Sequence, residues 1–211
     1  SYNNVQYHTP ADLLPLGIVA KVGYAPNMNG AAGDSAKSGG AHETKAVGDD
    51  TTQYKLTASP IDGLSIGADY MIANGPKNLT LYEEESAGAF AKYVTGPVSI
   101  GYARTGYQPV TNPGDTTTNY ESDMYGIQLA VNDALTVSYS QEEFTKHTST
   151  ALSNAGVLTA ATNIDMEVTH VQAAYVVGGA TLGVAIADTD NDDFTTGQEA
   201  KVTTFSVAMA F

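Results

Sequence analysis

The chain ends on Ala200-Lys201-Val202-Thr203-Thr204-Phe205-Ser206-Val207-Ala208-Met209-Ala210-Phe211, and this stretch decides the fold. From Phe205 onward, large apolar side chains occupy the odd positions, and Ser or Ala occupies each position between them. Because successive strand residues point to opposite faces, the stretch predicts a strand with one apolar face and one small, weakly polar face. About 10 alternating residues that end on an aromatic side chain are typical of a transmembrane β-strand, whose aromatic residue anchors at the membrane–water boundary.

The composition limits the class of protein. The 211 residues contain no Cys, which excludes disulfides and thiolate metal sites. They contain no run of 18 apolar residues, which excludes a spanning helix but leaves a spanning barrel open. The net charge of −14 argues against a nucleic-acid partner, because contacts with phosphate need a basic surface. Thirteen Tyr and 21 Gly favour strands and turns over helices.

The same alternation recurs along the whole chain and predicts about 11 strands. The predicted strands lie near residues 3–10, 16–24, 53–60, 64–72, 87–95, 98–103, 123–131, 135–139, 168–177, 182–186 and 200–211. Tight turns alternate with long polar loops, and the predicted long loops are residues 26–50, 74–86, 108–119, 144–163 and 188–199. Short turns at one end and long loops at the other are the layout of an outer-membrane barrel, whereas a soluble β-sandwich would place long loops at both ends. We therefore predict an all-β, antiparallel up-and-down transmembrane β-barrel, with residues 1–211 forming a single domain.

This layout also predicts the direction of the barrel. If Phe211 is at the periplasmic end, all long loops face outside, and 19 of the 23 Asp and Glu residues lie in or beside these loops as an acidic rim. The outward aromatic residues should then form two girdles near the membrane boundaries. We expect Tyr24, Tyr54, Tyr70 and Tyr125 nearer the upper boundary and Tyr7, Tyr93, Tyr175 and Phe211 nearer the lower one. High β-propensity of Tyr is the competing explanation.

If the apolar face meets lipid, the opposite face lines water. The candidate pore-lining residues are Gln6, His8, Lys21, Lys55, Asp69, Lys92, Gln128, Ser138, His170 and Gln172. The three lysines fall near mid-strand, where wall charge biases which ions and solutes pass. Ordinary exposure on a polar face is the alternative for these lysines. Arg104 falls on the predicted lipid side, which requires either a bulge near Gly106 or an interfacial position.

Two short segments carry a family resemblance. Asn3-Asn4-Val5-Gln6-Tyr7-His8-Thr9-Pro10, followed by Leu16-Gly17-Ile18, resembles the Asn-rich strand that follows the third extracellular loop in Gram-negative general porins. Ala91-Lys92-Tyr93-Val94-Thr95-Gly96-Pro97-Val98-Ser99-Ile100-Gly101-Tyr102 and the terminal Phe are similar to porin segments too. The terminal Phe also resembles the signature that is read during insertion of bacterial outer-membrane barrels.

The resemblance implies a fuller architecture than this chain alone provides. General porins are homotrimers of 16-stranded barrels, so the 11 predicted strands would be strands six to sixteen. The first five strands and the inward-folded constriction loop would then be missing from the chain. A complete smaller barrel is the alternative, although bacterial single-chain barrels use even strand numbers. The family's basic constriction residues come largely from the missing strands, so none is transferred to this chain.

Other chemistry has weaker support in the sequence. Asp188, Asp190, Asp192 and Asp193 offer oxygen ligands suited to Ca²⁺, but the segment lacks the Gly and distant Glu of an EF-hand loop. A solvated acidic loop is therefore the preferred interpretation, and we expect no metal or cofactor. No nucleophile, zinc-protease or phosphate-binding motif occurs, so we expect no enzyme activity.

The functional prediction is a diffusion porin of the bacterial outer membrane. It would be a water-filled, trimeric channel in outer-membrane lipid that passes small hydrophilic solutes and ions. The acidic rim favours cations at the mouth and the luminal lysines oppose this at mid-depth; we expect a mild cation preference. The alternatives are an outer-membrane barrel that serves as a surface receptor or adhesion protein through its acidic loops, and a soluble β-sandwich binding module.

Overall fold

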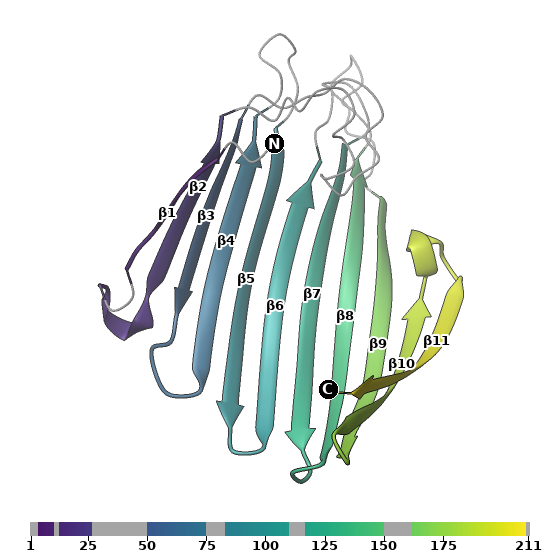
Figure 1. The fold of residues 1–211 in the computed structure, drawn as a ribbon. Coiled ribbons are helices and arrows are strands. Elements are labelled where there is room, and N and C mark those ends of the chain that lie inside the picture. Colours follow the sequence, from purple (N-terminus) through teal and green to yellow (C-terminus); the bar gives the residue numbers. More distant parts are fainter. Residues whose placement is uncertain are drawn as a thin grey trace.

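Eleven antiparallel strands form one sheet, in which every strand pairs with its neighbours in sequence (Figure 1). The computed structural model describes residues 4–10, 13–26, 50–74, 83–109, 117–149 and 162–209. The strands are β1 (Val5–His8), β2 (Val19–Ala25), β3 (Thr51–Ala58), β4 (Leu64–Ala73), β5 (Glu84–Thr95), β6 (Val98–Gln108), β7 (Thr117–Ala130), β8 (Leu135–Ser149), β9 (Thr162–Val177), β10 (Ala180–Asp190) and β11 (Glu199–Met209). Two 3₁₀ turns accompany them, η1 (Pro15–Gly17) and η3 (Asp192–Phe194). No helix in the described ranges is long and apolar enough to cross a membrane.

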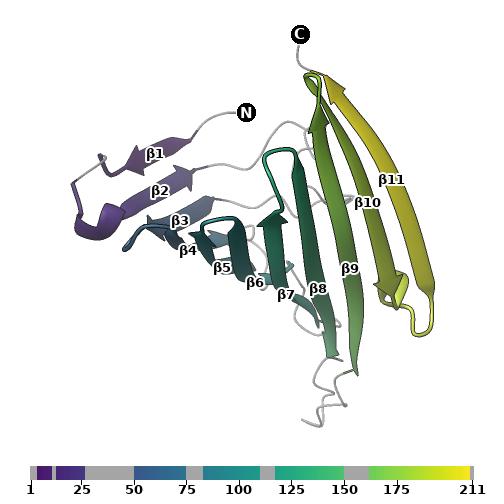
Figure 2. The same cartoon turned by 90° about the horizontal axis from the view of Figure 1, so that it is seen from below.

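The sheet curves into an open trough with a concave and a convex face (Figure 2). Within the described part of the chain, β1 pairs only with β2 and β11 only with β10, so the two strands form the edges of the trough. A β-sandwich needs a second sheet packed on the first around a shared core. The described residues form a single layer, which rules out the soluble sandwich as the fold and confirms the antiparallel up-and-down architecture.

Several strands are longer than the alternation predicts. β7 starts at Thr117 and β8 continues to Ser149, inside segments that we predicted as loops. β9 starts at Thr162, six residues before its predicted start, and β5 starts at Glu84. The loop predictions were wrong there because they relied on apolar residues at every second position. Beyond the apolar band both faces of these strands carry polar side chains, so the alternation disappears although strand pairing continues.

The register is unbroken in each of the ten strand pairs. Along every pair the partner residues advance one for one, from Val5 opposite Tyr24 in β1–β2 to Asp190 opposite Glu199 in β10–β11. A bulge would shift one strand by a residue and exchange its two faces. Without a bulge in these pairs, the apolar band of each strand stays on the convex face, and the concave face carries the polar residues together with some apolar ones such as Phe90.

Candidate pore wall

The convex face carries a continuous apolar band. One row of directly paired residues crosses seven strands and is apolar or aromatic at every position: Leu64, Tyr93, Ile100, Ile127, Tyr139, Val171 and Ile186. The side chains of this face are open to the surroundings, and Phe205 on β11 is 79% exposed. Ala73 is the single buried apolar residue in the described ranges. A sheet with this much exposed apolar surface and so little core is stable against lipid rather than water.

The apolar band crosses the rows obliquely, which reveals the tilt of the strands. The row that starts at Leu64, at the lower end of the band on β4, ends at Ile186, which is at its upper end on β10. On β4 the band reaches Tyr70 and Ile72, six and eight residues above Leu64, so it shifts by about one residue per strand over six strands. With a rise of about 3.3 Å per residue and a strand spacing of about 4.8 Å, this shift corresponds to a tilt of about 35°. Such a tilt is the one that closed membrane barrels require.

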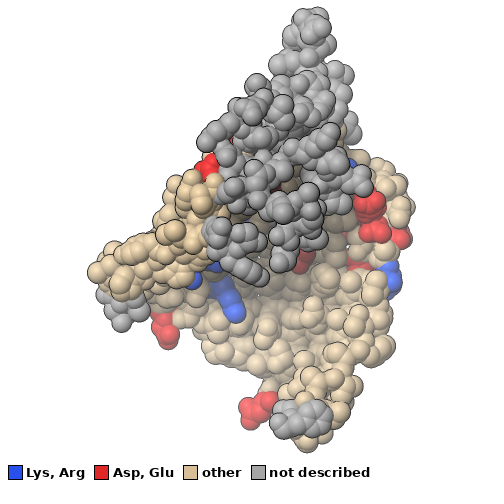
Figure 3. Space-filling view, turned by 45° about the horizontal axis from the view of Figure 1, so that its top comes forward, with Lys and Arg blue, Asp and Glu red and all other residues tan. Residues whose placement is uncertain are grey.

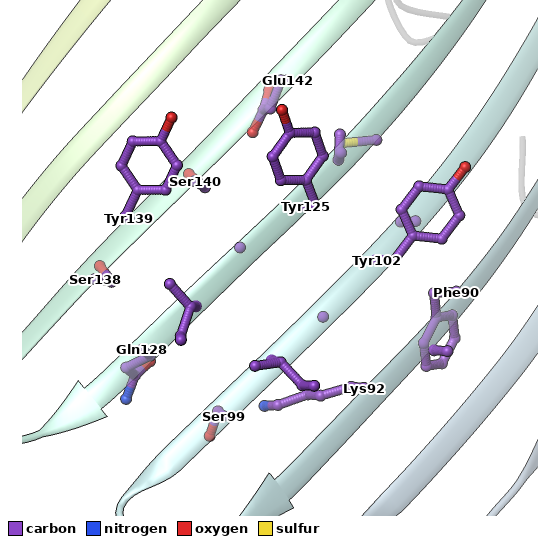
Figure 4. A pocket seen from close by; sticks show the side chains of 17 residues that line it. Phe90, Lys92, Ser99, Tyr102, Tyr125, Gln128, Ser138, Tyr139, Ser140 and Glu142 are labelled. Atoms are coloured by element: carbon purple, nitrogen blue, oxygen red, sulfur yellow. The ribbon is translucent and has the colours of Figure 1, made fainter.

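The predicted girdle tyrosines all occupy the convex face. After correction for the shift of one residue per strand, the register puts Tyr24, Tyr54, Tyr70 and Tyr125 at the upper end of the band. It puts Tyr93 and Tyr175 at the lower end, and Tyr7 between the two ends. Phe211 lies outside the described residues. Tyr102 and Tyr139 also belong to this face. Their rings stand beside that of Tyr125 over three consecutive strands (Figure 4).

A polar cluster lies directly above this part of the band. The Arg104 guanidinium approaches Glu121 to 2.7 Å and Asp123 to 4.0 Å, and the Tyr102 hydroxyl donates a hydrogen bond to Asp123. Because the β5–β6 and β6–β7 registers are continuous, no bulge turns Arg104 inward. Arg104 therefore occupies the interfacial position, the second of the two possibilities that the sequence left open. Its guanidinium is therefore neutralised by carboxylates at the edge of the band.

Some strand-borne acids extend this cluster over the convex surface, whereas others, such as Glu142, share the concave face. Glu143, Glu167 and Asp188 follow the register of the convex face on β8, β9 and β10. Asp188 accepts a hydrogen bond from Lys201 at 2.6 Å. The predicted acidic rim is therefore partly directed away from the pore mouth, a feature that the positions of the acids in the sequence did not reveal.

The four weak Ca²⁺ candidates do not come together. Asp188 and Asp190 follow the convex face of β10, and Asp188 is paired with Lys201, whereas Asp192 and Asp193 lie in η3. In the described parts of the chain, no three His, Asp or Glu side chains are grouped closely enough to hold a metal ion. The chain turns from β10 into η3 between the two pairs of acids.

The concave face places several predicted pore-lining residues side by side. His8, Lys21, Lys55 and Asp69 are successive partners in one row across β1 to β4. No carboxylate of the described residues lies within 4.0 Å of either lysine. The carboxylate nearest in register is that of Asp69, which leans over Gly88. A Cβ atom added at Gly88 would lie 3.2 Å from the Asp69 Oδ1 atom. Lys21 and Lys55 are thus direct partners on the concave face of β2 and β3, and basic side chains are visible in the hollow of the trough (Figure 3).

The remaining predicted residues lie in three further rows on this face. Gln128 and Gln172 flank Ser138, and Lys92 and His170 lie in the next row, separated by Gly101, Gly126 and Ser140. Gln6 lies beside Gly23, opposite Gln53. Small residues between long polar ones leave the wall shallow and wettable, as a water-filled lumen requires.

An aromatic group on the concave face was missed by the sequence analysis. Tyr107 and Tyr120 are stacked with ring centroids 6.4 Å apart, and Tyr107 donates a hydrogen bond to Glu84 at 3.2 Å. The signal that could have found this group is parity: Tyr107 comes five positions after Tyr102 in the same strand, so the two rings must point to opposite faces.

Comparison with solved structures supports the same architecture. The fold resembles an anion-selective porin from Comamonas acidovorans, with a TM-score of 0.68, 12% sequence identity, and coverage of 99% of this chain and 59% of that one. It also resembles OmpT, an outer-membrane protein of Vibrio cholerae, in two structures. The in-vitro folded trimer form gives a TM-score of 0.56 at 13% identity (97% of this chain, 61% of that one), and the outer-membrane expressed form gives 0.55 at 13% identity (97% and 62%).

The chain has the fold of outer-membrane β-barrels. It spans about 60% of the length of the structures that it matches. No protein-family model matches the sequence, and no curated protein matches it either. At 12–13% identity the likeness concerns the fold alone.

Proposed function

We propose that this chain forms the wall of a trimeric diffusion porin in the bacterial outer membrane. The pore passes small hydrophilic solutes and ions without chemical turnover, and selects among them by its width and wall charge. The observation that carries this proposal is the unbroken register, which keeps the apolar band on the convex face and the candidate pore-lining residues on the concave face in every strand pair. A polar inner surface on a lipid-compatible sheet is useful only if water fills the space that it encloses.

Conductance of the purified protein in planar bilayers tests this proposal. A porin gives stable, weakly voltage-dependent steps, and a trimer gives steps grouped in threes. Mass measurement of the detergent-solubilised assembly provides an independent value for the number of subunits. Binding at the cell surface without any conductance would instead support the receptor or adhesion alternative, whose extracellular loops lie mostly outside the described residues.

Replacement of both Lys21 and Lys55 by Gln should shift ion selectivity further toward cations. These two ammonium groups face the concave side without a nearby carboxylate among the described residues, so they raise the local potential. We expect the wild-type pore to prefer cations mildly, and the double variant to show a cation-to-anion permeability ratio about twofold higher. Reversal potentials in asymmetric KCl measure this ratio. Lys201→Gln is the matched control, because Lys201 is paired with Asp188 on the convex face.

An unchanged reversal potential in the double variant would place both lysines away from the ion path. A wild-type pore that prefers anions would contradict the expected cation preference. The change in permeability ratio between the wild-type protein and the double variant would still be a separate test of the two lysines.

A further inference from the structure

The connection between β10 and β11 folds onto the wall of the trough. β9 projects five residues beyond the end of β10, because Asp190 pairs with Glu167 whereas β9 starts at Thr162. Residues 191–198, here called the strap, contact this projecting part of β9 instead of standing free above the strands. The Asn191 amide donates a hydrogen bond to the Asp165 carbonyl at 2.8 Å, which fixes the first residue of the strap.

The strap reaches past β9 to two further strands. The Phe194 ring lies 5.9 Å from the Tyr120 ring of β7, and the Lys146 Nζ of β8 lies 5.6 Å from the centre of the Phe194 ring. Tyr120 pairs with Lys146, and both share the concave face with Ser122 and Ser138 by the parity of the continuous β7–β8 register. Phe194 therefore extends the aromatic group of Tyr107 and Tyr120 from a loop into the space that the trough encloses.

The backbone of the strap is held in an unfavourable conformation. Asn191, Asp193 and Phe194 have φ angles of 54°, 51° and 54°, a left-handed region that a bulky residue such as Phe rarely occupies. Hydrogen bonds inside the strap hold this shape. The Asp192 backbone N–H donates to the Gln198 carbonyl at 2.9 Å, and the Gly197 backbone N–H donates to the Asn191 Oδ1 atom at 2.8 Å. Backbone strain of this kind persists where surrounding contacts over-determine it, and is concentrated at functional positions.

We infer that the strap is a fixed narrowing of the pore on its loop side, and that Phe194 is a residue that determines solute size and passage there. The inference rests on the proposed porin function. The position of Phe194 on the concave wall gives the solute path an aromatic surface. This surface lies above the apolar band, where the side chains on the convex face are polar. Because Phe194 contacts Tyr120 and Lys146, the narrowing is part of the wall rather than a loose loop.

Single cysteines introduced into a cysteine-free chain test the inference directly. Phe194→Cys, and separately its exposed neighbour Thr195→Cys, are treated with a charged methanethiosulfonate reagent during bilayer recording. If the strap lies in the solute path, modification lowers the single-channel current by about a third or more. Phe205→Cys is the matched control, since Phe205 lies on the convex face of β11 and its modification should leave the current unchanged.

A second measurement removes the narrowing instead of blocking it. Replacement of residues 192–197 by a two-residue Asn-Gly turn should raise the conductance about 1.5-fold and admit larger neutral sugars in vesicle-swelling assays. Wild-type conductance that neither modification nor loop shortening alters would overturn the role of the strap and leave the porin proposal intact. A wild-type protein without conductance would overturn both.

Discussion

Replacement of Ile127 by Arg should abolish most insertion, while the same replacement at its neighbour Gln128 should be tolerated. Ile127 lies within the row of seven apolar and aromatic residues that crosses the convex face, and its side chain is 49% exposed to whatever surrounds the barrel. An Arg on the lipid face near the middle of a bilayer destabilises a barrel by about 2–4 kcal/mol. Gln128 is one residue along β7 and points to the concave side, where a guanidinium would stay in water.

The pair is a sharp test because both variants add the same charge to the same strand. Refolding into phospholipid vesicles, followed by far-UV circular dichroism and urea titration, gives the yield of folded protein and its free energy of unfolding. Equal losses in the two variants would contradict the assignment of faces, and with it the pore wall. In bilayer recordings, Gln128→Arg should additionally shift selectivity toward anions, because it adds a positive charge to the lumen.

The sheet with two different faces could be predicted from the sequence because the alternation of residue types within each strand is enough to identify its apolar face. Large residues at every second position identify the apolar face within β4 or β11 without any knowledge of their neighbours. The pairing register is then strongly constrained, since a slip of one residue would exchange the two faces of a whole strand. Strand ends were harder to predict. Beyond the band, residues such as Glu121 and Glu143 face water on the outside of the barrel, and nothing in their local sequence separates a strand from a loop.

The candidate site was predictable in composition but not in arrangement. Parity places Lys21 and Lys55 on the concave face, yet their direct pairing follows from the β2–β3 register, which depends on where the long segment between the two strands returns. Contacts of the strap were inaccessible for the same reason. Phe194 is 74 residues from Tyr120 in sequence, and its place beside that ring depends on how far β9 projects beyond β10.

Replacement of Gly63 by Ala should destabilise the barrel far more than replacement of Gly96 by Ala. Both glycines lie in short turns at the same end of the strands, and both have positive φ angles, 78° at Gly63 and 52° at Gly96. A Cβ atom in the left-handed region costs about 1–2 kcal/mol, so this term is common to the two variants. The surroundings differ: a Cβ at Gly63 would lie 2.2 Å from the Val94 carbonyl oxygen, whereas at Gly96 it would meet nothing within 4 Å.

The difference between the two variants therefore isolates the steric term. Val94 also donates a backbone hydrogen bond to the Gly63 carbonyl at 2.9 Å, so movement of this turn away from the Cβ would weaken the bond that connects it to β5. We expect a total loss of about 3 kcal/mol or more for Gly63→Ala and about 1 kcal/mol for Gly96→Ala in urea titrations of the vesicle-inserted protein. Similar losses in both variants would mean that the β3–β4 turn does not approach β5 as closely as described. Since that approach positions β4 against β5 along the row from Leu64 to Tyr93, the apolar band itself depends on the outcome.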